Sequence, residues 1–235
     1  MSEPIRPSTV LPAIRTPFHI TTEDGERLIG EVSAPIANPT TALLCLHPNP
    51  TGGGMMDSHV YKKAANRLPA MAGVTVIRFN TRGTASEAGT STGQYDGGRA
   101  EKYDVQAAIN YCFNELQVRE LWVVGWSFGT EIALGHARDP RIKGLILLSP
   151  PLMKVEDSDL DFWASDGRPI TALVPEHDDY LKPDEARKRF ARIPQLNLIA
   201  VDGAKHLWVG EPYVHRVLSE IVGIIAPTRL PLPTE

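Results

Sequence analysis

Ser127 stands at the centre of the pentapeptide GWSFG, residues 125–129. An apolar run at 121–124 precedes this pentapeptide, and a stretch with helical spacing follows it. A serine at a sharp turn between a strand and a helix projects its hydroxyl from the end of the sheet, and the crowded backbone two residues to either side favours glycine. The same pentapeptide also arises by chance, with the serine serving only as a helix N-cap. The strand before it and the helix after it favour a nucleophile.

A serine nucleophile needs a general base within hydrogen-bond reach, because a hydroxyl is weakly nucleophilic at neutral pH. Two of the seven histidines lie just beyond predicted strands: His47 directly after the first, and His206 in the loop after the last. His206 comes after Ser127 and after every plausible acid, which is the chain order Ser, Asp, His of one group of serine enzymes. His47 precedes the serine and is followed by prolines. We therefore assign His206 as the base and keep His47 as the alternative. The other histidines fall in a hairpin, in helical stretches or in an acidic loop: His19, His59, His136, His177 and His215.

The base in turn needs an acid that holds its tautomer and stabilises the imidazolium. The strand predicted at 170–174 is followed by a loop that contains Glu176, Asp178 and Asp179. Asp178 is the preferred candidate, since four residues beyond the strand it can reach the imidazole. Asp179 is the near alternative and Glu176 a weaker one. The strand before this one is followed by prolines and offers no acid until Glu156.

A tetrahedral intermediate also needs two N–H donors for its oxyanion. One is expected from the backbone of Phe128, the residue after the nucleophile. The other is expected from the loop after the first parallel strand, HPNPTGGG at 47–54. Pro48 and Pro50 have no N–H, so Asn49 provides the first donor available after His47. A phosphate-binding glycine loop is a weak alternative, because neither G-x-G-x-x-G nor G-K-[ST] is present.

These residues require a sheet that brings the ends of several strands together. Residues 17–35 alternate between apolar and polar types around the turn signal at 23–25, which predicts a hairpin. Short apolar runs typical of fully buried strands then recur at 41–46, 74–79, 121–125, 145–148, 170–174 and 196–201. Helical spacing alternates with them at 57–71, 101–116, 128–137, 183–190 and 212–225. This alternation predicts an α/β fold, with a mostly parallel twisted sheet, helices on both faces and an N-terminal antiparallel hairpin.

Composition and charge bear on the class of partner, the compartment and the number of domains. The chain has 235 residues, of which 42% are hydrophobic, and a net charge of −4, so it has no basic footprint for nucleic acid. No signal peptide or membrane-spanning run is visible, and we expect a cytoplasmic protein. Cys45 and Cys112 lie in apolar segments and are expected to be reduced core residues. We predict an N-terminal arm at 1–16, a single domain at 17–225 and a proline-rich, extended tail at 226–235.

Taken together, the motifs LHPNPTGGGMM, RFNTRGTASEAGTS, GWSFGT, PEHDD and GAKHLWVG resemble those of the α/β-hydrolase superfamily. The likeness covers residues 17–225 and is nearest to compact, capless bacterial serine hydrolases of esterase type. It implies a catalytic triad of Ser127, Asp178 and His206, with the oxyanion hole at Asn49 and Phe128. Pro48 stands where most relatives have glycine. Pro175 also stands where relatives often have glycine, which leaves the choice between Asp178 and Asp179 open.

The resemblance also bears on the cap, which relatives often insert between the strands that here end near Ser149 and begin near Ile170. This interval has room only for a loop or one small helix, so we expect an exposed site. The interval carries four acids at 156–161, which would disfavour anionic substrates if they overhang the site. Five side chains are candidates for a substrate-binding wall: Trp126, Met153, Phe162, Trp163 and Leu207.

The function implied is hydrolysis of a small-molecule carboxylic ester or thioester through an acyl-enzyme, with no metal or cofactor required. Thioesterase, peptidase and cofactor-free perhydrolase activities on the same residues are alternatives. A ligand-binding relative without catalysis is another, although such relatives commonly lose a triad member. The oligomeric state does not follow from the sequence.

Overall fold

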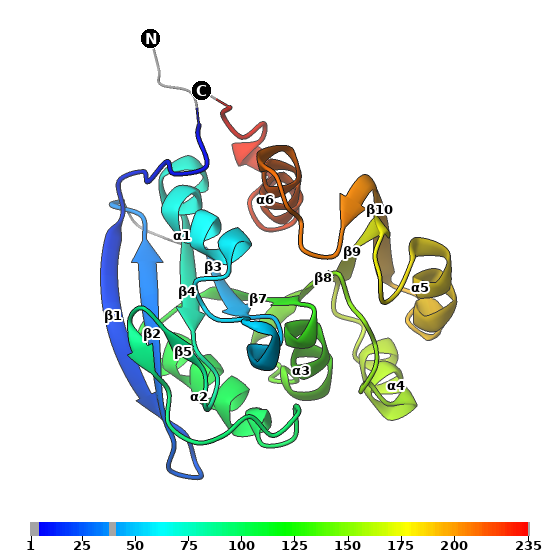
Figure 1. The fold of residues 1–235 in the computed structure, drawn as a ribbon, viewed down its shortest axis with the longest axis horizontal. Helices are drawn as coiled ribbons and strands as arrows, with labels where there is room; N and C mark the ends of the chain where they lie inside the picture. Colours follow the sequence, from blue (N-terminus) through cyan, green and yellow to red (C-terminus); the bar gives the residue numbers. More distant parts are fainter. Residues whose placement is uncertain (1–4, 38–40, 235) are drawn as a thin grey trace.

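The computed structural model describes residues 5–37 and 41–234, and at its centre lies an eight-stranded mixed sheet (Figure 1). Its strands are β1 (Ile14–Thr21), β2 (Arg27–Ala34), β3 (Thr41–Leu46), β4 (Val74–Phe79), β7 (Glu120–Trp126), β8 (Ile142–Leu148), β9 (Ile170–His177) and β10 (Leu196–Lys205). Across the sheet the order is β1-β2-β4-β3-β7-β8-β9-β10. The β1–β2 and β2–β4 pairs are antiparallel and the other pairs are parallel. The predicted fold class is confirmed.

Helices cover both faces of this sheet (Figure 1). They are α1 (His59–Ala72), α2 (Glu101–Asn114), α3 (Phe128–His136), α4 (Asp157–Asp166), α5 (Pro183–Arg189) and α6 (Glu211–Ile225). One apolar core lies between the sheet and α1 and α6, and a second lies between the sheet and the helices α2 to α5. Strands β3 and β4 are buried at every position, which fits their largely apolar sequences, and the buried Arg78 of β4 is the charged exception.

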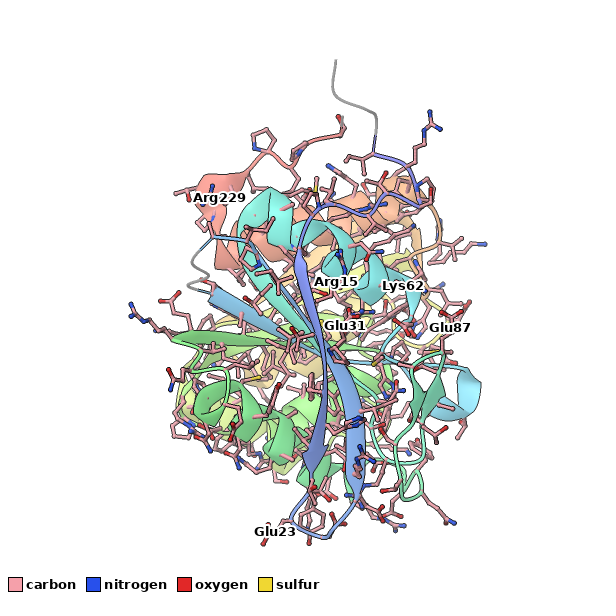
Figure 2. All side chains as sticks on the ribbon, turned by 90° about the vertical axis from the view of Figure 1, so that its left-hand side faces the viewer. Arg15, Glu23, Glu31, Lys62, Glu87 and Arg229 are labelled. Atoms are coloured by element: carbon pink, nitrogen blue, oxygen red, sulfur yellow. The ribbon has the colours of Figure 1, made fainter. Side chains whose placement is uncertain are left out.

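The N-terminal hairpin forms one side of the molecule. Figure 2 shows it running across the front, with Glu23 at its turn. Strand β1 begins at Ile14, inside the segment predicted as an arm, because residues 14–16 pair with the end of β2. In β2, the Glu31 carboxylate accepts a hydrogen bond from Arg78 of β4 at 2.5 Å, which ties the hairpin to the parallel strands.

The two chain ends lie against the same part of the fold. The Ile5 N–H donates to the Thr234 carbonyl, and the Leu11 N–H donates to Asn66 of α1. The predicted tail is not extended throughout, since residues 227–229 form a 3-10 turn, η3 (Pro227–Arg229). Residues 1–4 of the predicted arm and residue 235 of the tail lie outside the described residues.

The predictions for the cysteines and for the interval between β8 and β9 can be compared with the structure directly. Both cysteines are buried and free, as predicted. Between β8 and β9 the chain forms a single ten-residue helix, α4, which fits the short interval between these strands. A small antiparallel pair, β5 (Ala85–Ser86) and β6 (Gly89–Thr90), was not expected. In the part of the chain that the structure describes, every helix is too short or too polar to cross a membrane.

Candidate active site

Ser127 occupies the turn between β7 and α3 with φ 53° and ψ −119°, a backbone conformation that non-glycine residues rarely adopt. Crowding around this turn explains both flanking glycines. A Cβ at Gly125 would overlap the carbonyl of Gly129, and a Cβ at Gly129 would overlap the carbonyl of Leu46 at the end of β3. The turn is thus wedged between two strands, and the Ser127 hydroxyl is left partly exposed at their carboxyl end.

Three side chains from different loops form one hydrogen-bonded chain. The Ser127 Oγ lies 2.8 Å from the His206 Nε2. On the other side of the ring, the His206 Nδ1 lies 2.9 Å from Oδ2 and 3.1 Å from Oδ1 of Asp178. His206 and Asp178 are 6% and 3% exposed, so this pair is nearly dry although only the short helix α4 stands where a cap would be. The structure therefore brings together the three residues singled out as nucleophile, base and acid.

Strand pairing explains why the acid and the base meet. Both β9 and β10 run further than predicted, to His177 and Lys205, and these two residues pair across a shift in register. Asp178 and His206 are the first residues after the two strands, so they emerge side by side. The predicted gap of four residues between strand and acid is wrong, since Asp178 follows β9 directly.

The two alternative acids have other surroundings. The Glu176 carboxylate accepts the Gly203 N–H at 2.7 Å and so stabilises the irregular part of β10. Asp179 is exposed to solvent, next to the buried Asp178. Of the three carboxylates in this loop, Asp178 is the one that contacts His206.

His47, the alternative base, is fully buried and engaged on both ring nitrogens. Its Nε2 accepts the Thr81 N–H at 3.1 Å, so Nδ1 must carry the proton, which it donates to the Pro48 carbonyl at 2.7 Å. Burial lowers the pKa of His47 to about 4, so the ring is neutral at pH 7. His47 is thus a structural support of the loop at 47–54.

This neutral histidine predicts a loss of stability in mild acid. Between pH 6.5 and about 4 the unfolded chain binds a proton at His47 and the folded chain does not, so the free energy of unfolding falls as the pH falls. Because of His47, we expect the free energy of unfolding to be about 2 kcal/mol lower at pH 5 than at pH 7. Urea denaturation at both pH values should show that loss in the wild type and lack it in His47→Asn.

The difference between the two proteins isolates His47 from other titrating groups. The pKa of the Asp104 carboxyl, raised by burial to about 6, gives a slope of opposite sign, but it does so in both proteins. An equal loss of stability in wild type and variant would contradict the prediction.

The loop after β3 presents the expected backbone donor. Because the Pro48 carbonyl points to His47 and the peptide bond is trans, the Asn49 N–H of the same peptide group points the opposite way. Among the described residues, no group accepts a hydrogen bond from this N–H. The Phe128 N–H is likewise outside the intrahelical bonds, since Phe128 is the first residue of α3. Two unpaired donors therefore flank the ends of β3 and β7.

Three side chains to which the sequence analysis gave no such role hold the backbone at 206–207. The His206 carbonyl accepts from the Trp126 Nε1 at 3.2 Å and from the Ser149 Oγ at 3.0 Å. The next carbonyl, of Leu207, accepts from the His59 Nε2 at 2.7 Å. No local pattern could reveal these contacts, because each joins segments more than fifty residues apart.

Residues with a strained backbone cluster in the loops around this site. Five non-glycine residues in the described ranges have positive φ, and four of them lie in the loops after β7, β8 and β10: Ser127, Ser149, Leu152 and Trp208. Each such residue costs of order 1–3 kcal/mol and persists only where its surroundings impose it. The hydrogen bonds to Ser149 and to the His206 loop are part of what imposes it here.

The five side chains expected to form a substrate wall have different positions. Trp126 and Trp163 are buried, and their indole N–H groups donate to the carbonyls of His206 and Leu134, so neither offers a free surface. Phe162 is half-buried under the Arg138 guanidinium. Met153 and Leu207 are exposed, at 70% and 53%, and Leu207 adjoins His206. Only these last two present a largely exposed apolar side chain, and of the two Leu207 is the one next to the triad histidine in the chain.

A cavity of about 560 Å³ begins at the Phe128 side chain and follows α3 past Ile132 and His136. Neither Ser127 nor His206 lines it. The Lys154 ammonium crosses its edge, where it donates to the Tyr95 hydroxyl and the Gly97 carbonyl. The cavity is thus beside the serine rather than over it.

The acids of α4 are largely paired. Arg192 donates to Asp157 and Asp161 at 2.7 and 2.8 Å, and Arg138 pairs with Asp159. This run therefore presents less negative charge than its sequence suggests.

Comparison with known proteins identifies what this fold resembles. Residues 41–220 match the family model described as the alpha/beta hydrolase fold. Among solved structures, an alpha-beta serine hydrolase homologue from Coxiella burnetii is similar with a TM-score of 0.74 and 23% identity, over 90% of this chain and 97% of that one. A serine hydrolase without lid from Xanthomonas campestris has a TM-score of 0.70 and 24% identity, over 92% and 94% of the two chains. An esterase from Pyrococcus furiosus has a TM-score of 0.72 and 19% identity, over 95% and 99%. No curated protein matches the sequence.

Proposed function

Because the chain belongs to the alpha/beta hydrolase family, we propose that it is a serine hydrolase that cleaves a carboxylic ester through an acyl-enzyme. The observation that carries this proposal is the hydrogen-bonded chain from Ser127 through His206 to Asp178. Serine hydrolases and esterases among the structures with the same fold are consistent with it.

In the proposed reaction, the His206 Nε2 takes the Ser127 proton as Oγ bonds to the ester carbonyl carbon. The carbonyl oxygen becomes an oxyanion, which the N–H groups of Asn49 and Phe128 stabilise. The C–O bond to the alcohol then breaks, and His206 returns the proton to the leaving oxygen. In the second half-reaction His206 takes a proton from water as the water oxygen bonds to the acyl carbon. The bond to Ser127 Oγ then breaks and His206 returns the proton to Oγ, which releases the acid and restores Ser127.

Asp178 keeps the His206 Nδ1 protonated, so that Nε2 is free to accept, and its charge stabilises the imidazolium formed in each half-reaction. We propose an ester with a small or medium acyl group, since the exposed Leu207 beside His206 offers apolar contact and the cavity next to the serine is not lined by Ser127 or His206.

Hydrolysis of p-nitrophenyl acetate and butyrate, together with labelling by a fluorophosphonate, tests the proposal. We expect turnover of both esters and stoichiometric labelling that is lost in Ser127→Ala. Ser165→Ala, which alters an exposed serine of α4, is the matched control and should label like the wild type. A folded protein that neither hydrolyses the esters nor reacts with the probe would overturn the assignment.

The oxyanion donor at Asn49 can be tested separately, because the backbone there already suits proline. Asn49 has φ −54°, close to the angle that a proline ring fixes. Asn49→Pro removes the N–H and should lower kcat by about 10²–10³-fold. Asn49→Ala keeps the N–H and loses only the side-chain bonds to Thr51, so its kcat should stay near the wild-type value. Equal kcat values for the two variants would exclude this N–H as a donor.

A further inference from the structure

Tyr180 lies against the proposed base. Its ring centroid is 4.5 Å from that of His206, with the two planes inclined by 52°. The Tyr180 side chain faces solvent and is 58% exposed, whereas His206 and Asp178 beneath it are nearly buried. Only a short helix lies between β8 and β9, where relatives often have a cap, and the Tyr180 ring packs on the His206 imidazole instead.

The acid that orients His206 also fixes Tyr180. The Oδ1 of Asp178 accepts the N–H of Tyr180 at 2.9 Å and the N–H of Leu181 at 3.3 Å. Leu181 is buried in the core, so the turn is anchored on both sides of the tyrosine. The ring therefore has a defined place over the imidazole, although it lies at the surface.

We propose that Tyr180 is a positioning residue for His206, which shields the His206–Asp178 hydrogen bond from water and stabilises the imidazolium as it forms. This inference rests on the proposed function.

Two physical effects give the ring this role. A hydrogen bond to a charged group is stronger where water is excluded, and the exposed Tyr180 ring packs against the nearly buried His206. An aromatic ring also attracts a cation within about 6 Å of its centroid, and His206 is within that distance. The base is neutral when substrate binds and cationic in the transition state, so the attraction raises kcat rather than substrate affinity.

Steady-state kinetics of Tyr180→Ala and Tyr180→Phe with p-nitrophenyl acetate test the role. Tyr180→Ala should lower kcat about three- to tenfold, the size of an aromatic contact, and change KM by less than about twofold. Tyr180→Phe keeps the ring and should restore the wild-type kcat. Tyr103→Ala, at a half-buried tyrosine of α2, is the matched control and should leave both constants unchanged.

Three kinetic results would overturn the proposal. One is an unchanged kcat in Tyr180→Ala. Another is a loss confined to KM, which would make Tyr180 a substrate contact. The third is an equal loss in Tyr180→Phe, which would assign the effect to the hydroxyl.

Proton NMR separates this proposal from the proposed function, because it needs no substrate. The His206 Nδ1 proton, hydrogen-bonded to Asp178, should give a far-downfield resonance in the wild type and in Tyr180→Phe. In Tyr180→Ala its exchange with water should be about three- to tenfold faster. An unchanged exchange rate would overturn the shielding role even in an active hydrolase, and faster exchange would support it even if no tested ester is cleaved.

Discussion

Replacement of Ser127 by alanine should lower kcat by about 10⁴–10⁶-fold, the largest effect expected of any single substitution in this chain. The only hydrogen bond of the Ser127 Oγ among the described residues is to His206, so its removal takes away the nucleophile and little else. Residual turnover would come from the proposed oxyanion donors, the N–H groups of Asn49 and Phe128, which do not depend on the serine hydroxyl. Ester hydrolysis under saturating substrate measures the loss.

The fold should survive this substitution. Alanine has the same Cβ as serine, so the backbone strain at a φ of 53° does not increase. The close backbone contacts at Gly125 and Gly129 also stay as they are. Thermal unfolding should therefore occur at the wild-type temperature or slightly above, since active-site polar groups commonly cost stability. Ester turnover in Ser127→Ala above about one part in a hundred of the wild-type rate would place the nucleophile elsewhere.

The features that the sequence predicted well are local ones. The turn at Ser127 is specified within five residues. A strand-to-helix turn of this kind brings neighbouring backbone so close to positions 125 and 129 that only glycine fits there. The hairpin, the buried parallel strands and the position of His206 after the last strand likewise follow from periodicity and chain order. Such features need no knowledge of which distant segments meet.

The ends of β9 and β10 were missed because their pairing depends on a long-range contact. Residues 175–177 and 202–205 contain proline, glycine and charged side chains, which do not resemble a buried strand. They extend the sheet because the Glu176 carboxylate binds the Gly203 N–H across the irregularity, after which His177 pairs with Lys205. The alignment of acid and base is thus a product of the folded sheet.

The tryptophans near the site were also misjudged because their role depends on long-range contacts. Large apolar side chains near a nucleophile are reasonable wall candidates, but Trp126 points to the His206 carbonyl and Trp163 to that of Leu134. An indole has an apolar body and one donor, so burial against a carbonyl satisfies both parts. Nothing in the sequence distinguishes that use from contact with a ligand.

Asp178→Asn should lower kcat by about 10⁴-fold, and the structure explains why an isosteric change is so costly. The Oδ1 of Asp178 accepts two backbone N–H groups, those of Tyr180 and Leu181. In the asparagine variant the amide oxygen must keep that position, which turns the NH₂ group toward the His206 Nδ1, now 2.9 Å from Oδ2. A donor there forces Nδ1 to accept, so the imidazole proton moves to Nε2 and the ring can no longer take the Ser127 proton.

The adjacent carboxylate provides the matched control. Asp179→Asn removes a charge of the same sign one residue away, at an exposed position, and should change kcat by less than about twofold because solvent screens that charge. Both variants should unfold cooperatively near the wild-type temperature, since the amide oxygen at 178 retains the two backbone bonds. If Asp179→Asn instead suffers the large loss and Asp178→Asn does not, the acid of the triad is Asp179 and the contact between Asp178 and His206 is structural only.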